Sequence, residues 1–256
     1  MKIIKFMTKV GKTPHYGLLH DGHARVIVAD PFEGMIVGTS ETYPEEEIIL
    51  LAPCNPSKIV AVGLNYKDHA EELDMPLPDE PLLFLKPPSS VIGHGDEIIG
   101  PRMSNRVDFE AELGVVIGKR AKDIPPEKVN RYILGYTCVN DVTARDLQKK
   151  DVQFTRAKGF DTFCPIGPWI ETELDPKDIL IESRLNGEIK QSSRTGQFIH
   201  DVPSLISFIS QVMTLEPGDV VSTGTPKGVG PMQPGDEITV SIEGIGELKN
   251  RFAIRD

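Results

Sequence analysis

The chain has 256 residues, 39% of them hydrophobic, which is enough for one large domain or for one domain with a small companion. Acidic residues outnumber basic ones by 38 to 28, and the net charge of -10 argues against nucleic acid or an anionic membrane as partners, because like charges repel. No apolar run approaches the ~18 residues that a membrane helix requires, so no membrane association is predicted.

The first 53 residues are predicted to form a small N-terminal domain, because short strand-like runs alternate there with Gly, Pro, Asp and His. A second domain is predicted over residues 54–256. The boundary falls at Pro53-Cys54-Asn55-Pro56, where prolines interrupt regular structure. The segment from Met1 to Phe6 breaks its apolar residues with lysines too early for a secretion signal, and an odd number of cysteines fits no disulfide framework. A cytoplasmic location is therefore predicted.

Strand signals dominate the rest of the chain. Strand-like runs occur at residues 58–64, 179–185, 188–192, 219–223, 237–242 and 248–254. Asn186-Gly187 separates two of these runs and predicts a tight hairpin, since both residues tolerate positive φ. Helices are predicted at residues 66–73, 125–134 and 203–213, the last with a proline suited to its first turn and an apolar stripe. Many strands with few helices predict a β-dominated α+β fold.

The segment from Asp108 to Ile117 reads Asp-Phe-Glu-Ala-Glu-Leu-Gly-Val-Val-Ile and carries the strongest functional signal. Alternation along a strand places Asp108, Glu110 and Glu112 on one face. Carboxylates stacked beside a core repel each other and lose hydration, and a bound Mg²⁺, Mn²⁺ or Ca²⁺ would offset both costs. The alternative is a half-exposed strand with a hydrated acidic face, and this segment alone does not separate the two interpretations.

Residues 63–72 read Gly-Leu-Asn-Tyr-Lys-Asp-His-Ala-Glu-Glu, and a short helix there would place His69 and Glu72 on one face. A carboxylate beside an imidazole raises its basicity and orients it, as a general base that activates water requires. An exposed helix with an incidental pair is the alternative, and the segment taken alone favours it.

A further polar set follows the apolar strand that ends at Asp141. A helix is predicted to begin there, which places Asp141, Arg145 and Gln148 on one helical face at steps of four and three residues. Asp141 is either the N-cap of that helix or a third carboxylate for a metal. The segment alone does not separate these two roles.

Lys158 lies in a glycine-flanked turn, from which its ammonium group can reach a substrate carboxylate or a developing enolate; a solvated surface lysine is the alternative. Residues 222–228 lack the spacing of a phosphate loop, and Thr225 there is a candidate substrate contact through its hydroxyl group or its backbone N–H. Neither a Gly-x-Ser-x-Gly elbow nor a His-Glu-x-x-His helix occurs, which argues against those two catalytic designs.

Taken together, six segments in this order resemble the fumarylacetoacetate hydrolase family. They are Gly63–His69, Phe84–Ser90, Asp108–Leu113, Asn140–Gln148, Lys158–Thr162 and Thr223–Pro226. The similarity spans about residues 58 to 254. The resemblance implies a mixed β-sandwich roll preceded by a small N-terminal domain and assembled as a homodimer.

The same resemblance implies a metal site and a set of functional residues. Glu110, Glu112 and Asp141 match the ligands of Mg²⁺ or Mn²⁺, with Ca²⁺ as a structural substitute, whereas Asp108 is a neighbour and not a ligand. The predicted catalytic residues are His69 and Glu72, which match a water-activating pair carried on a lid, and Lys158. The predicted substrate-binding residues are Arg145, Gln148, Thr225 and Lys86.

Fumarylacetoacetases proper carry a further upstream acidic ligand and a longer N-terminal domain, so the smaller acylpyruvase and decarboxylase/isomerase branch fits this chain better. The predicted function is divalent-metal-dependent hydrolysis of a C–C bond in acylpyruvate-type substrates (2,4-dioxo acids) through a metal-stabilised enolate. The alternatives are an oxaloacetate-type decarboxylase and a 2-hydroxyhepta-2,4-diene-1,7-dioate isomerase. A non-catalytic protein that binds a metal or ligand is a more distant one.

Overall fold

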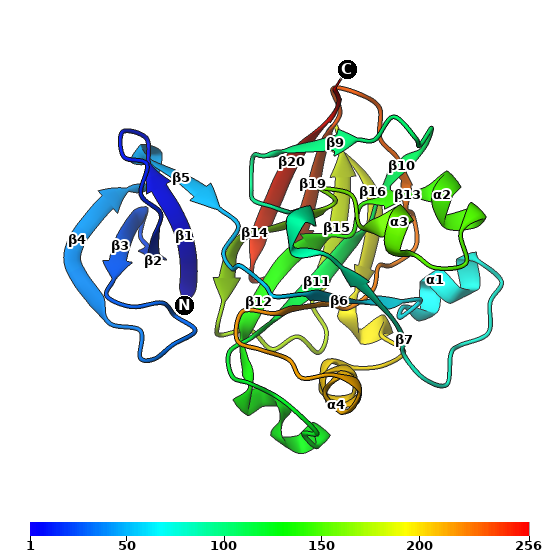
Figure 1. Cartoon of the computed structure of the whole chain (residues 1–256), viewed down its shortest axis with the longest axis horizontal. Helices are drawn as coiled ribbons and strands as arrows, with labels where there is room; N and C mark the ends of the chain where they lie inside the picture. Colours follow the sequence, from blue (N-terminus) through cyan, green and yellow to red (C-terminus); the bar gives the residue numbers. More distant parts are fainter. Residues whose placement is uncertain (256) are drawn as a thin grey trace.

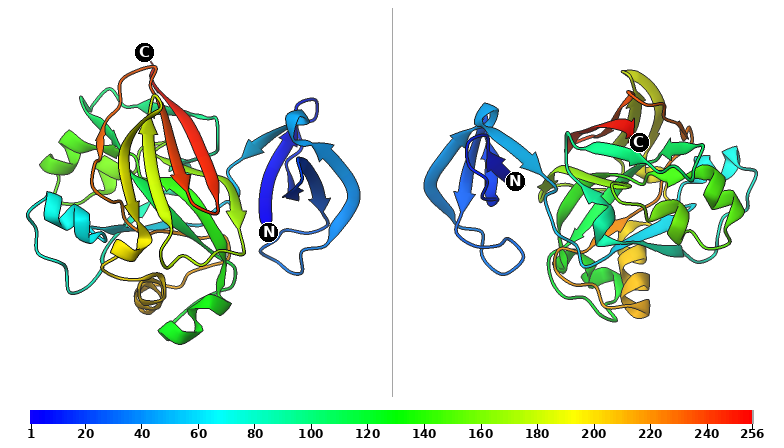
Figure 2. Two further views of the ribbon diagram at one scale, coloured as in Figure 1. Left: turned by 180° about the vertical axis from the view of Figure 1, so that it is seen from behind. Right: turned by 45° about the horizontal axis from the view of Figure 1, so that its top comes forward.

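The computed structural model of the protein describes residues 1–255. A small N-terminal unit stands beside a larger one, and the two further views show the same arrangement (Figures 1 and 2). The small unit consists of β1 (Lys2–Thr8), β2 (His15–His20), β3 (His23–Ile27), β4 (Gly38–Pro44), the 3-10 helix η1 (Glu45–Glu47) and β5 (Ile48–Leu51). Its strands enclose an apolar cluster of their own, formed by Ile4, Phe6, Leu19, Ala24, Val26 and Ile48.

The larger unit is built mainly of strands. They are β6 (Ile59–Gly63), β7 (Leu82–Lys86), β8 (Val91–Ile92), β9 (Glu97–Gly100), β10 (Val107–Phe109), β11 (Ala111–Ile117), β12 (Ile133–Asn140), β13 (Thr143–Ala144), β14 (Cys164–Glu171), β15 (Leu180–Leu185), β16 (Glu188–Arg194), β17 (Val220–Ser222), β18 (Gly230–Pro231), β19 (Glu237–Ile242) and β20 (Gly246–Ile254). The helices are α1 (Lys67–Glu72), α2 (Arg145–Lys150), α3 (Thr155–Lys158) and α4 (Val202–Val212), with 3-10 turns η2 (Pro88–Ser90), η3 (Pro126–Arg131) and η4 (Thr195–Gln197).

One long sheet runs through both units in the order β4-β3-β2-β1-β14-β12-β11-β17-β6-β7. The junction is the antiparallel pairing of β1 with β14, where Lys2 lies opposite Glu171 and Ile3 opposite Ile170. A second sheet has the order β16-β15-β19-β20-β9, and a third the order β13-β10-β18. Because most pairs are antiparallel but β6 with β17 and β9 with β20 are parallel, the sheets are mixed.

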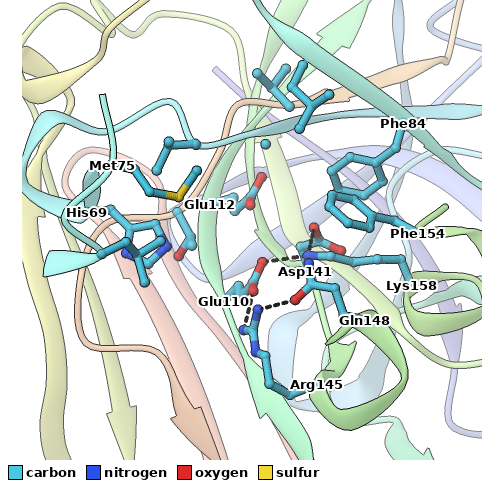
Figure 3. Close-up of a pocket in the computed structure, with 16 residues that line it drawn as sticks. His69, Met75, Phe84, Glu110, Glu112, Asp141, Arg145, Gln148, Phe154 and Lys158 are labelled. Carbon is cyan, nitrogen blue, oxygen red and sulfur yellow. Dashed lines mark hydrogen bonds and ion pairs between the residues drawn. The ribbon is translucent and has the colours of Figure 1, made fainter. Parts of the chain in front are cut away.

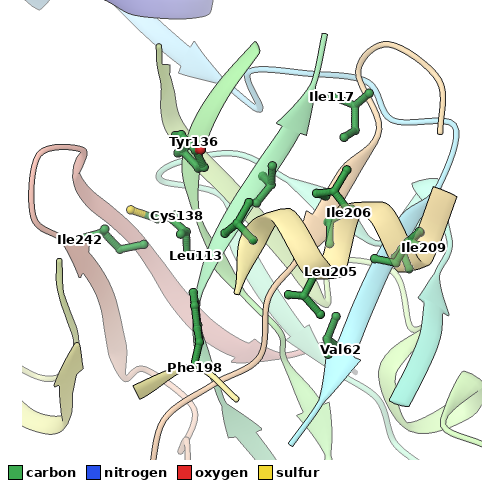
Figure 4. Packing of buried hydrophobic residues seen from close by; sticks show 14 of the residues in the cluster. Val62, Leu113, Ile117, Tyr136, Cys138, Phe198, Leu205, Ile206, Ile209 and Ile242 are labelled. Carbon is green, nitrogen blue, oxygen red and sulfur yellow. The ribbon is translucent and has the colours of Figure 1, made fainter. Parts of the chain in front are cut away.

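The main core lies between the long sheet and the five-stranded sheet (Figure 4). Leu113 of β11 and Ile242 of β19 are each no more than 1% exposed and belong to the same apolar cluster. Helix α4 closes the cluster with the stripe of Leu205, Ile206 and Ile209, all fully buried. The predicted β-dominated α+β fold, with a mixed β-sandwich roll and a small N-terminal unit, is confirmed.

The hairpin and the helix α4 form as the sequence predicts, but one other predicted helix is wrong. Asn186 and Gly187 have φ of 52° and 83° and connect β15 to β16, as the Asn-Gly pair predicts. The helix predicted at residues 125–134 is only the short turn η3, because the apolar run that begins at Ile133 is taken up by the central strand β12. No helix within residues 1–255 has both the length and the apolar character needed to cross a bilayer.

Candidate active site

The acidic segment Asp108–Ile117 does not form one continuous strand, because it is interrupted at Glu110. Strand β10 ends at Phe109 and β11 begins at Ala111, so Glu110 stands between two strands. Its backbone N–H donates to the side-chain oxygen of Asn140 at 3.0 Å, and its carbonyl accepts from the N–H of Asp141 at 2.9 Å. These two bonds fix the end of β12 against the break in the acidic strand, and they bring Asp141 beside Glu110.

Three buried carboxylates converge in the cavity of Figure 3. Glu110, Glu112 and Asp141 are 5%, 1% and 1% exposed, and each offers an oxygen within 4.8 Å of the others. We call these residues the carboxylate triad. Oxygen donors of this kind are the ligands that Mg²⁺ and Mn²⁺ take in proteins. The hydrated acidic face that the strand pattern left open as an alternative is therefore not what the structure shows.

Three cationic side chains hold two members of the triad, Glu110 and Asp141, in place. Lys158 is 3% exposed and donates to Glu110 Oε2 at 2.7 Å and to Asp141 Oδ2 at 2.6 Å. Arg145 donates to the other oxygen of Glu110, and Lys86 to the other oxygen of Asp141. Lys158 is thus not a solvated surface lysine, since buried charges in proteins are normally paired in this way.

Glu112 differs electrostatically from its neighbour. Burial alone would raise the pKa of Glu110, but the charges of Lys158 and Arg145 outweigh it and bring that pKa to about 2. Burial, followed by the charges of Asp141 and Glu110, raises the pKa of Glu112 to about 8.

The hydrogen bonds of Glu112 also leave room for a cation. Its Oε2 accepts from the Ser222 hydroxyl at 2.6 Å and from the Gly224 N–H at 2.8 Å, while Oε1 has no hydrogen-bond donor among residues 1–255. A carboxylate oxygen without a donor, beside two further carboxylates that line the same cavity, fits a hard divalent cation.

Asp108 lies outside the triad. It is fully buried, and its carboxylate accepts from Arg106 at 2.9 and 3.0 Å and from Arg145 Nε at 2.9 Å. Arg145 therefore bridges Asp108 to Glu110. Face alternation correctly gathers the three acids of the segment, but two guanidinium groups satisfy the first of them.

The predicted pair of His69 and Glu72 is formed on α1. His69 Nδ1 lies 2.8 Å from Glu72 Oε2, and His69 is 9% exposed and lines the cavity. Because Nδ1 faces the carboxylate, Nε2 is the ring nitrogen left for the cavity. Glu72 also accepts a hydrogen bond from the backbone N–H of Gly228 at 3.1 Å. Gly228 has a φ of 95°, and a Cβ there would clash with the carbonyl oxygen of Lys190, so this position requires glycine.

Arg145 and Gln148 interact as the helical spacing predicts, but Asp141 does not cap their helix. Helix α2 begins at Arg145, after the short strand β13, and has no side-chain N-cap. Arg145 donates to Gln148 Oε1 at 2.6 Å, and both side chains line the cavity. Of the two roles left open for Asp141, the N-cap is therefore wrong.

The side chains of Lys86 and Thr225 are not placed for the substrate contacts that the sequence predicts. Lys86 is fully buried and is not among the residues that line the cavity, because its ammonium group lies behind Asp141. Thr225 lines the cavity, but its hydroxyl donates to the Ala111 carbonyl at 2.9 Å and accepts from Gln191 at 2.8 Å. The backbone N–H of Thr225 is thus the group left for a substrate.

Gln191 is a positioning residue that the sequence pattern missed. It is 1% exposed in β16, accepts from the Ala111 N–H at 3.0 Å and donates to Thr225 and to the Pro226 carbonyl, each at 2.8 Å. These bonds fasten the 223–228 loop to the start of β11. A single glutamine in a strand belongs to no recognisable motif, so the sequence offers no signal for this role, and only the burial seen in the structure marks the residue.

The cavity itself has a volume of about 230 Å³. The triad, Arg145, Gln148 and Lys158 form one part of its wall, and His69 of α1 faces them (Figure 3). The rest of the wall is apolar and comes mainly from the segment after α1, from β7 and from the loop before α3. It comprises Val62, Leu64, Leu73, Met75, Leu82, Phe84 and Phe154.

Two family profiles match the chain. The fumarylacetoacetate (FAA) hydrolase C-terminal profile covers residues 58–253, and the Rv2993c-like, N-terminal profile covers residues 1–53. The chain therefore belongs to the fumarylacetoacetate hydrolase family, as its six motifs predict.

Three similar proteins have stated activities. The mitochondrial oxaloacetate tautomerase FAHD2A of Bos taurus is 37% identical over 286 aligned residues, which cover 98% of this chain and 91% of that protein. The crystal structure of 5-carboxymethyl-2-hydroxymuconate delta-isomerase from Mycobacterium smegmatis is 42% identical, with a TM-score of 0.93 and 100% of both chains covered. A maleylpyruvate hydrolase from Sphingobium sp. SYK-6, solved with manganese(II) and pyruvate, is 29% identical, with a TM-score of 0.83 and 100% of both chains covered. All three are enzymes of small organic acids.

Proposed function

We propose that this chain is a divalent-metal-dependent hydrolase that cleaves the C3–C4 bond of acylpyruvates. The observation that carries the proposal is the cavity in which a buried carboxylate triad faces His69, itself paired with Glu72. Cleavage of this bond needs negative charge to be stabilised at one end of the substrate and water to be activated at the other. The two halves of the cavity supply groups for these two tasks.

Glu110, Glu112 and Asp141 are the residues that would hold Mg²⁺ or Mn²⁺, with Ca²⁺ as a structural substitute. Such a cation acts as a Lewis acid that polarises the 2-oxo group and favours negative charge on its oxygen. Lys158 keeps a positive charge 2.7 Å from Glu110 and 2.6 Å from Asp141, and so adds to the stabilisation of an enolate at this end. A related maleylpyruvate hydrolase was solved with manganese(II) and pyruvate, which supports a divalent cation together with a 2-oxo acid as the occupants of this cavity.

His69 takes the role of general base. Its Nε2 accepts a proton from water, while Glu72 holds the Nδ1–H and stabilises the imidazolium that forms. The hydroxide adds to the C4 carbonyl, the C3–C4 bond breaks, and its electron pair becomes the enolate of pyruvate. The imidazolium returns the proton to C3. The products are pyruvate and a carboxylic acid, and atoms and charge balance with one water consumed.

Arg145, Gln148 and the backbone N–H of Thr225 are the proposed substrate contacts beside the triad. Arg145 also keeps Glu110 in place, since it donates to both Asp108 and Glu110. Lys86 is proposed to position Asp141 from behind, without touching the substrate.

Proton transfer on oxaloacetate or on an unsaturated dioate is the second candidate. The similarity to bovine oxaloacetate tautomerase over 98% of this chain, and to a delta-isomerase at a TM-score of 0.93, favours it. Tautomerisation and isomerisation pass through the same enolate and need a proton carrier but no attacking water. Decarboxylation of oxaloacetate forms that enolate by loss of CO₂.

The deciding experiment uses acetylpyruvate and oxaloacetate with MnCl₂ or MgCl₂, followed by EDTA. Release of acetate and pyruvate that stops with EDTA is the expected result for the hydrolase. Metal-dependent conversion of oxaloacetate with no cleavage of acetylpyruvate would transfer the assignment to the second candidate. If neither substrate is consumed in a metal-dependent way, both candidates are wrong.

The proposal extends to the domain organisation and the oligomeric state. We propose a division into domains at residues 1–53 and 54–256, supported by the separate apolar cluster of the N-terminal strands. We also propose a homodimer, which follows from membership of the family. Light scattering during size-exclusion chromatography tests the dimer directly, since a single monomer mass at micromolar concentration would contradict it.

A further inference from the structure

The cavity is polar at one end and apolar at the other. The carboxylate triad and its cations form the inner end, whereas five apolar side chains surround the mouth: Leu73, Met75, Leu82, Phe84 and Phe154. We call these five residues the apolar mouth. In Figure 3 Met75 lies beside His69, and Phe84 and Phe154 lie above Lys158 on the other side. The two rings pack edge to face, with centroids 5.5 Å apart.

None of the five residues of the apolar mouth carries a charge that could meet a second carboxylate. Within residues 1–255, Arg145 and Lys158 are the only arginine and lysine side chains that line the cavity, and both are paired with the carboxylates of its inner end. Arg145 is held at the inner end by hydrogen bonds to Asp108, Glu110 and Gln148. Lys158 is occupied by Glu110 and Asp141, and its ammonium group lies 5.1 Å from the centre of the Phe84 ring.

We propose that the preferred substrate has an apolar tail on the carbonyl that is attacked, an alkyl or aryl acyl group, and not a second carboxylate. This inference rests on the proposed function and narrows its substrate class. It distinguishes the chain from relatives whose stated substrates carry two or more carboxylates. Of the residues at the mouth, Leu82 is assigned as a determinant of this specificity.

The physical reason is the difference in solvation between the two kinds of tail. Leu73, Met75 and Leu82 are 50%, 50% and 52% exposed, so an alkyl group lying on them removes apolar surface of both partners from water. Each methylene buried in this way is worth roughly fourfold in affinity. A carboxylate in the same place would lose hydration with no partner to replace it, which is unfavourable.

The primary test compares butanoylpyruvate with succinylpyruvate, which differ only in a terminal methyl group against a terminal carboxylate. With Mn²⁺ bound, kcat/KM for butanoylpyruvate is expected to be at least about tenfold higher. Turnover of both with equal kcat/KM, or a preference for succinylpyruvate, overturns this inference and leaves the proposed function standing. Turnover of neither overturns the proposed function and this inference together.

A variant pair locates the effect at the mouth. Leu82 begins the strand β7 and packs over Gly63, so a longer side chain there can extend along the opening. Leu82→Arg is expected to shift the ratio of the two kcat/KM values about tenfold or more toward succinylpyruvate. The uncharged control Leu82→Gln should not favour the dicarboxylate to the same extent. Equal shifts in both variants would show that charge at this position does not set specificity.

Binding without turnover provides an independent readout. The 2-oxo acids 2-oxohexanoate and 2-oxoadipate lack the 4-oxo group and again differ in a terminal methyl against a carboxylate. Calorimetric titration into the manganese-loaded protein is expected to give the lower Kd for 2-oxohexanoate. Tighter binding of 2-oxoadipate by the wild-type protein would contradict the assignment of the apolar mouth.

Discussion

Replacing Glu112 with glutamine is expected to remove cation binding and to leave the fold intact. Glu112 is 1% exposed, and one of its oxygens accepts hydrogen bonds from Ser222 and Gly224. The amide oxygen of Glu112→Gln can accept both bonds, but the neutral amide lacks the charge that a hard divalent cation requires. Without metal Glu112 is already largely neutral below its raised pKa of about 8, so the metal-free variant should melt at no lower temperature than the wild type.

The expected size of the effect follows from the linkage between binding and folding. A cation present at 100 times its Kd adds about 2.7 kcal/mol to the free energy of unfolding when it binds only the folded state. For a chain of 256 residues this corresponds to a rise in melting temperature of roughly 5 to 10 °C. Wild-type protein freed of metal with EDTA should show this rise on addition of MnCl₂, and Glu112→Gln should show none.

Differential scanning fluorimetry measures the melting temperature without metal and its rise on addition of MnCl₂. The matched control is Asp108→Asn. Asp108 is a buried acid in the same segment but lies outside the triad, where Arg106 and Arg145 bind it. The control is expected to keep the manganese-induced rise even if its baseline stability falls. A full rise in Glu112→Gln, or a loss of the rise in Asp108→Asn alone, would refute the assignment of the triad.

Three further substitutions test the other proposed roles. His69→Ala should lower kcat for acetylpyruvate hydrolysis by about 10²–10⁴-fold and spare oxaloacetate decarboxylation; an equal loss of both in parallel assays would rule out water activation as its role. Lys86→Met removes one partner of a buried ion pair, so urea denaturation in EDTA should show a loss of about 3 kcal/mol, and an unchanged midpoint would contradict this. Gly228→Ala should displace the N–H that holds Glu72 and reduce hydrolysis, while the melting shift with Mn²⁺ persists; wild-type kcat would show that this bond is dispensable.

Local chemistry made much of the fold predictable. The Asn186-Gly187 hairpin and helix α4 depend on neighbouring residues, and both formed as predicted. Residues 125–134 illustrate the limit, because this segment forms only the short turn η3 and its last two residues belong to β12, where pairing with β11 and β14 decides the conformation. The junction of β1 with β14 could not be predicted, since strand register between distant segments is not encoded in local periodicity.

The sequence predicts the part of the site in which a motif brings several charged residues together. It does not predict the single residues that position the site from elsewhere in the chain. Glu110 and Glu112 stand out because alternating acids beside an apolar run are unusual. Asp141 could be assigned by pattern only as one of two roles, and the start of α2 at Arg145 excludes the N-cap. Gln191 escaped notice because its function depends on contacts with a loop that is remote in sequence.

At Ile170 and Glu171 strand β14 is an inner strand because β1 lies beside it, whereas β8 pairs with its other end at Cys164 and Pro165. Without β1, the backbone N–H and C=O groups at that end of β14 would form an open sheet edge, the kind of surface that recruits strands from other molecules. By pairing with β14, strand β1 therefore closes this part of the sheet edge, a structural role that is separate from the chemistry of the cavity. A relative built without β1 would need a charge, a proline or a covering loop at the same edge.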